Sequence, residues 1–161
     1  MAIVSNDPRN PRIVSGPRRL IYGALEADSQ SFKAGQFIYL VAGAVTAAAA
    51  GDTPIAGIAA KDATNVSSDN IEIPFYALTA ANEIQIQVTT TATLEAANTT
   101  CTPGTSYDIY VTSNFCTLNS ADTDNPALVY LDPVLDSTGT ATYWCRACLK
   151  GAEDQLRQDN L

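Results

Sequence analysis

The residues best suited to chemistry in this sequence are four cysteines, because the chain contains no histidine. Cys145 and Cys148 have the spacing of half a zinc knuckle, and Cys101 with Cys116 could complete a set of four thiolates. The second pair is too widely separated for a zinc ribbon, and Cys145 and Cys148 fall on opposite faces if they lie on a regular strand. We therefore expect free, buried thiols, with a disulfide or a metal site as the alternatives, and no cofactor.

Motifs of the common enzyme classes are missing from the sequence. Without histidine the chain lacks the usual general base near neutral pH. The stretch from Asp136 to Gly139 resembles an aspartic-protease loop, but it holds one residue too many and is more typical of a turn. Glycine-rich phosphate loops and nucleophile elbows do not occur. The sequence therefore predicts a protein that is not an enzyme.

Charge is distributed unevenly along the chain. The net charge is −8, yet the first 19 residues carry +3 and the remaining 142 carry −11. An acidic body argues against nucleic acid as a partner, because binding phosphates requires clustered basic side chains. The apolar run over residues 37–50 is too short to span a bilayer, and the N-terminus has no signal-peptide core. We expect no membrane partner and a chain that stays in the compartment where it is made.

Residues 1–18 are predicted to form an extended basic arm. Pro8, Pro11 and Pro17 prevent a helix, because each removes a backbone donor and favours extended conformations. The arm has no core of its own, so we expect a neighbouring subunit to order it, with a disordered tail as the alternative. The expected contacts to that partner are apolar anchors and arginines, namely Ile3, Val4, Arg9, Arg12, Ile13, Val14, Arg18 and Arg19.

The rest of the chain is predicted to be an all-β domain of short strands. Ile84, Ile86 and Val88 alternate with polar residues, and apolar runs are cut by turn residues throughout. Gly43 is expected to supply the positive φ of a tight reversal, and Gly57 to allow a close backbone approach or a bulge. We therefore expect a single β-barrel or β-sandwich over residues 19–150, followed by a charged C-terminal tail over residues 151–161.

One long stretch also carries a family resemblance. The run AGQFIYLVAGAVTAAAAGDTPIAGIAAKDA, followed by IEIPFYAL and GTSYDIYV, resembles the small β-barrel cement or decoration proteins of tailed-phage heads. The likeness covers roughly residues 30–150, and the arm and the cysteines are not part of it. It implies a homotrimeric structural protein, made in the bacterial host cytoplasm, that sits on the outer surface of the capsid in the virion. Its partner there would be the major capsid protein, whose neighbouring subunits it would bridge.

Two other functions remain open on the sequence. The base of a head fibre would use the same barrel to hold an outward appendage. A carbohydrate-binding β-sandwich would also lack catalytic residues, and its candidate sugar platform is Trp144, the one tryptophan of the chain. A tryptophan in the middle of a strand more commonly belongs to a core or an interface.

Overall fold

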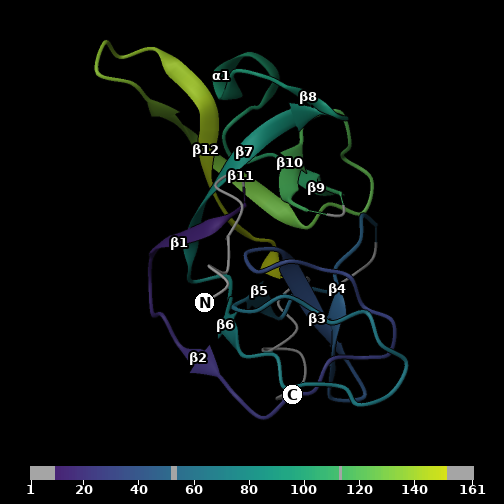
Figure 1. The fold of residues 1–161 in the computed structure, drawn as a ribbon. Coiled ribbons are helices and arrows are strands. Elements are labelled where there is room, and N and C mark those ends of the chain that lie inside the picture. Colours follow the sequence, from purple (N-terminus) through teal and green to yellow (C-terminus); the bar gives the residue numbers. More distant parts are fainter. Residues whose placement is uncertain (1–9, 52–53, 113, 152–161) are drawn as a thin grey trace.

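The computed structural model describes residues 10–51, 54–112 and 114–151. The fold is nearly all β, as the sequence predicts. Among the described residues no helix is both long and apolar enough to cross a membrane. The elements, labelled in Figure 1, are β1 (Arg12–Ser15), β2 (Leu20–Ile21), β3 (Phe37–Val41), β4 (Ala44–Ala47), β5 (Gly57–Ala59), β6 (Phe75–Ala77), β7 (Glu83–Thr90), β8 (Thr93–Leu94), α1 (Ala97–Thr100), β9 (Ser106–Val111), β10 (Cys116–Asn119), β11 (Leu128–Leu135) and β12 (Ala141–Leu149).

Five strands close into the predicted β-barrel. They pair in the order β7, β10, β9, β11 and β12, and β12 then pairs with β7 to complete the ring. The pairing of β10 with β7 is parallel and the other pairings are antiparallel. β1 adds to the start of β7, where Arg12 pairs with Gln85 and Ile13 pairs with Ile84. Closure of the ring leaves these strands few unpaired backbone groups.

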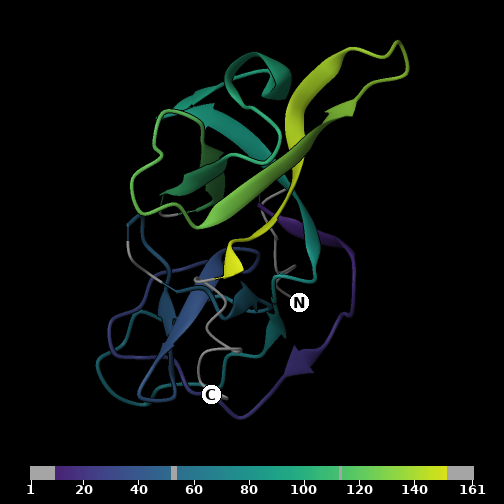
Figure 2. The same ribbon diagram turned by 180° about the vertical axis from the view of Figure 1, so that it is seen from behind.

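A second sheet lies against one end of the barrel (Figures 1 and 2). Its strands pair in the order β2, β6, β5, β3 and β4, all antiparallel. The hairpin between β3 and β4 turns on Ala42 and Gly43, which have φ values of 49° and 83°. Two positive φ values are what a two-residue hairpin turn needs, so the prediction for Gly43 is confirmed.

The prediction of a close backbone approach at Gly57 is also confirmed. A Cβ atom at Gly57 would overlap the carbonyl oxygen of Tyr76 and would lie 2.8 Å from the ring of Phe75. β5 and β6 pair along this contact, with Gly57 opposite Ala77 and Ile58 opposite Tyr76. The missing side chain therefore lets the backbone of β6 lie close beside that of β5 in the sheet.

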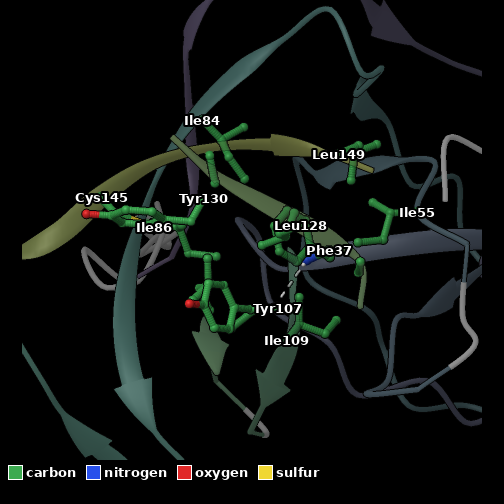
Figure 3. Close-up of a cluster of buried hydrophobic side chains, with 14 of the residues drawn as sticks. Phe37, Ile55, Ile84, Ile86, Tyr107, Ile109, Leu128, Tyr130, Cys145 and Leu149 are labelled. Carbon is green, nitrogen blue, oxygen red and sulfur yellow. Dashed lines mark hydrogen bonds between the residues drawn. The ribbon is translucent and has the colours of Figure 1, made fainter. Parts of the chain in front are cut away.

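The hydrophobic core continues from the barrel into the second sheet. Ile84, Ile86 and Leu128 fill the barrel, while Phe37 and Ile55 reach the same cluster from the other half of the chain (Figure 3). A smaller cluster, built around Ile38, Ile73 and Phe75, lies within the second sheet itself. The barrel proper therefore occupies residues 83–149, a narrower range than the 19–150 expected from the sequence. The strands before residue 83 form the second sheet and the attached β1.

Glu26 fixes the long loop that connects β5 to β6. Its carboxylate is buried and accepts hydrogen bonds from the backbone N–H of Thr64 at 2.8 Å, from the Thr64 hydroxyl, and from the N–H of Ile71 at 3.3 Å. Burial raises the pKa of Glu26, but the hydrogen bonds from Thr64 and Ile71 outweigh it and leave the pKa below its ordinary value. The carboxylate is therefore ionised at neutral pH and holds the loop through charge-assisted bonds.

Candidate functional site: a groove beside the first strand

A groove of about 380 Å³ lies between β1 and the second sheet. β1 and the turn after it form one wall, and β5 with Tyr76 of β6 forms the other. The lining residues are Pro11, Arg12, Ile13, Arg18, Ala34, Ile58, Ala59, Ala60 and Tyr76. Three of the predicted partner-contact residues, Arg12, Ile13 and Arg18, therefore come together at one site.

The arm segment that the structure describes is held by the chain's own fold. Asn10 is buried and its side-chain amide donates to the carbonyls of Ala34 (3.3 Å) and Asn114 (3.1 Å), while its side-chain oxygen accepts from the N–H of Cys116 (3.0 Å). Ile13 is 5% exposed and packs in the barrel core. The expectation that Ile13 contacts another subunit is therefore wrong, because its side chain is already covered.

Alternation along β1 decides which arm residues remain accessible. Val14 is 45% exposed, and Arg12 is exposed on the same side of the strand, because successive side chains point to opposite faces. Arg19 is exposed and its carbonyl accepts a hydrogen bond from the N–H of Ala77, which ties it to β6 rather than to the groove. The remaining predicted contacts, Ile3, Val4 and Arg9, lie outside the described residues.

Arg18 is positioned by the turn that follows β1. Gly16 has a φ of 88°, and the side-chain amide of Asn82 donates to the carbonyl of Pro17 at 2.9 Å. This turn brings the Arg18 guanidinium back onto the strand, where Nη2 donates to the carbonyl of Ile13 at 2.6 Å. The guanidinium is thereby held at the groove, and within the described part of the chain the bond to Ile13 uses one of its five N–H groups.

Arg12 is held from the other side by the barrel. Its Nε donates to the side-chain oxygen of Gln85 at 3.1 Å, and its guanidinium lies over the ring of Trp144, 4.9 Å from the ring centroid. This stacking is a cation–π contact. Both arginines of the groove are therefore fixed by neutral groups of the described residues, none of which compensates their positive charge.

The ion pairs of the described residues do not neutralise the groove. Arg146, on β12, pairs with Glu83 at 3.2 Å and with Asp132, to which its Nε also donates at 2.7 Å. Those hydrogen bonds hold the pKa of Asp132 below its usual range. Within residues 10–51, 54–112 and 114–151, neither Arg12 nor Arg18 has a carboxylate within 4.0 Å. The groove is thus a cationic site on an acidic chain.

The opposite wall supplies apolar and aromatic surface. Ile58 and Ala59 are buried at the base, and Tyr76 is 40% exposed at the rim. Tyrosine and arginine are among the residue types that dominate binding energy at protein interfaces. The groove can therefore bind a carboxylate that is attached to an apolar group. Sequence reasoning missed Tyr76. The alternation of a strand could have indicated that Tyr76 is exposed between Phe75 and Ala77, but it could not have indicated that Tyr76 and Arg18 line the same groove.

The cysteines do not form a site of their own. Cys145 points into the barrel and Cys148 lies half-buried on the other face of β12, so the predicted opposite orientation is confirmed. All four thiols are free, and burial raises the pKa of Cys101 to about 11 and that of Cys116 to about 12. Among the described residues, no group of three or more cysteine, aspartate or glutamate side chains is placed to hold a metal ion.

Comparison with known protein families, with curated proteins and with solved structures finds no match. The resemblance to phage decoration proteins therefore stays a prediction from the sequence pattern. The functional argument depends on the groove and on the surfaces around it.

Proposed function

We propose that this protein is a capsid decoration protein that binds the outer surface of a phage head and bridges neighbouring major capsid subunits. The proposal combines the sequence resemblance with an all-β fold suited to a purely structural role. The single observation that carries it is the groove, where two arginines predicted to contact a partner lie together and face no carboxylate among the described residues. A fixed, uncompensated cationic groove is suited to binding a protein surface rather than to catalysis.

The proposed work is mechanical. Each copy makes modest contacts, and a homotrimer multiplies them, because the second and third contacts of a tethered assembly form at high effective concentration. The trimer would then resist separation of the capsid subunits beneath it. Contacts between arginines and carboxylates weaken as salt screens them, so binding is expected to fall with ionic strength.

The carbohydrate-binding alternative loses support from the surroundings of its candidate platform. The Arg12 guanidinium occupies one face of the Trp144 ring, and the side chain is only partly exposed. A sugar would have to stack on the opposite face or displace Arg12. The head-fibre alternative uses the same barrel and differs from decoration in carrying an outward appendage.

Co-sedimentation with phage heads tests the proposal. Heads assembled without this protein are mixed with increasing amounts of the purified chain and pelleted. We expect saturable binding in a fixed ratio to the major capsid protein, and weaker binding at high salt. Arg18→Glu should bind more weakly, whereas Lys150→Glu, which makes the same charge change at a partly exposed site outside the groove, should bind like the wild type. A chain that stays in the supernatant at all concentrations would contradict decoration.

A further inference from the structure

The hairpin formed by β11 and β12 extends beyond the barrel. Figures 1 and 2 show it projecting from the end of the molecule opposite the second sheet. Near its tip, Leu135 is 54% exposed and Tyr143 is 52% exposed, although both are large hydrophobic side chains. Residues 133–144 contain no lysine or arginine, and Asp136 is their one charged residue. The projecting hairpin therefore carries two exposed large hydrophobic side chains and a single negative charge.

Asp136 presents that charge in a fixed position. Its Oδ1 accepts hydrogen bonds from the N–H groups of Thr138 (2.8 Å) and Thr140 (3.0 Å) and from the Thr138 hydroxyl (2.7 Å). These bonds, that of the Thr138 hydroxyl first, keep the pKa of Asp136 below its usual range. No hydrogen bond to Oδ2 occurs within the described part of the chain. The carboxylate is held by one oxygen and offers the other.

The hairpin and the groove are complementary in charge and in surface type. Arg12 and Arg18 line the groove together with Tyr76 and Ile58, and the hairpin carries one fixed carboxylate and the exposed side chains of Leu135 and Tyr143. The groove lies beside β5 and β6, while the hairpin points away from those strands (Figure 2). A copy therefore cannot fill its own groove with its own hairpin.

We propose that the β11–β12 hairpin of one copy docks into the groove of a second copy, with Asp136 bound by Arg18 and Arg12 and with Leu135 and Tyr143 packed against Tyr76. Such a head-to-tail contact uses two different surfaces, and repeated contacts form a closed ring when the rotation between copies allows it. This inference depends on the self-association part of the proposed function and supplies the surfaces for it. It does not depend on binding to a head.

The test uses two variants that each damage one side of the contact. Arg18→Glu places a negative charge in the groove. The double variant Leu135→Ser with Asp136→Asn removes the apolar and charged groups of the hairpin, while the new amide side chain keeps an oxygen that the turn can use. Matched controls are Lys150→Glu and Val66→Ser, which make similar changes at accessible sites elsewhere. Sedimentation velocity measures the assembly of each, and thermal melting confirms that each is folded.

We expect the wild type and both controls to form the same oligomer. Each damaged variant alone should have its dissociation constant raised by about tenfold or more, because it loses contacts of the kind that dominate interfaces. Mixed in equal amounts, the two variants should form a heterodimer of twice the 17.0 kDa monomer mass, because one intact groove meets one intact hairpin. A two-fold interface that pairs groove with groove, or hairpin with hairpin, would not give this result.

Three results would overturn the head-to-tail contact: a wild type that is monomeric at all concentrations, damaged variants that assemble like the wild type, or a mixture that stays monomeric. Co-sedimentation of the same proteins with heads separates this inference from the proposed function. A monomeric wild type that still decorates heads overturns the contact alone. Assembly through the hairpin without any binding to heads overturns decoration alone, and leaves the contact in place.

Discussion

The guanidinium of Arg12 lies 4.9 Å from the ring centroid of Trp144, so a residue of the predicted arm stacks on the last strand of the barrel. The two residues are far apart in the sequence, and they meet because β1 and β12 both pair with the start of β7. The same pairing places Ile13 in the barrel core and Arg12 at the groove. The first strand therefore couples the stability of the barrel to the geometry of the candidate site.

Replacing Ile13 with alanine should destabilise the barrel by about 2–4 kcal/mol, because it removes a buried aliphatic side chain and leaves a cavity. Val14→Ala, one residue away but exposed, should change stability by less than about 0.5 kcal/mol. Urea unfolding followed by tryptophan fluorescence measures both. Equal, small effects of the two variants would show that β1 does not pack in the core.

Deleting residues 1–18 should lower the melting temperature of the protein, because the deletion removes β1 and with it the buried side chain of Ile13. An arm that packs against no part of its own chain would leave the melting temperature unchanged.

Replacing Gly57 with alanine should lower the free energy of unfolding by more than about 1–3 kcal/mol. The new Cβ atom would overlap the carbonyl oxygen of Tyr76, so β5 and β6 would have to separate. Gly151→Ala is the matched control, since a Cβ atom there meets nothing within 4 Å. Thermal melting compares the two variants. The displacement of β6 should also move Tyr76, so Gly57→Ala should weaken assembly as well as stability. An unchanged melting temperature would mean that β5 and β6 are further apart than described.

Much of the fold follows from local signals in the sequence. The turn at Gly43 and the close approach at Gly57 each depend on a residue and its immediate neighbours, and each was predicted. In β7 the buried positions of Ile84, Ile86 and Val88 follow the predicted alternation, but Gln87 on the predicted polar face is also buried. The opposite orientation of Cys145 and Cys148 follows from the two-residue period of a strand. Such features require no knowledge of which strands are neighbours in space.

The features that sequence reasoning missed depend on contacts between distant segments. The division into a barrel and a second sheet is not encoded in the length or composition of any one strand. No pattern in the sequence marked Asn10 as important, yet its side-chain amide bonds the segment before β1 to the carbonyls of Ala34 and Asn114. Arg12 and Arg18 were predicted as contact residues from their charge. Tyr76 also lines the groove, and it does so because the fold places β6 across the groove from β1.

Glu26→Gln should reveal a pH-dependent part of the stability. The pKa of Glu26 is lowered from its ordinary value of 4.5, so the ionised carboxylate contributes stability above that value and loses it as the pH falls through the folded pKa. At pH 7 the variant should be less stable by about 2 kcal/mol, the typical worth of hydrogen bonds to a charged group. The difference between variant and wild type should shrink as the pH falls below 4.5 and through the lowered pKa of folded Glu26. A difference that stays constant with pH would refute the role assigned to the charge.

Cys148 should be the first thiol to react with iodoacetamide in the folded protein. Burial raises the pKa of all four thiols, so accessibility decides the order: Cys148 is half-buried, whereas Cys101, Cys116 and Cys145 are buried. Intact-mass spectrometry should show one added label under native conditions and four after unfolding. Cys148→Ser should abolish native labelling and leave the melting temperature unchanged, while Cys145→Ser should lower it. Native labelling of Cys145 ahead of Cys148 would contradict the assigned faces of β12.

Electron cryomicroscopy of phage heads assembled without the protein, before and after it is added back, tests whether this chain decorates the outer surface of a head, as we propose. We expect new density on the outer surface, shaped as a five-stranded barrel with its second sheet and lying across neighbouring capsid subunits. Identical reconstructions with and without saturating protein would contradict it.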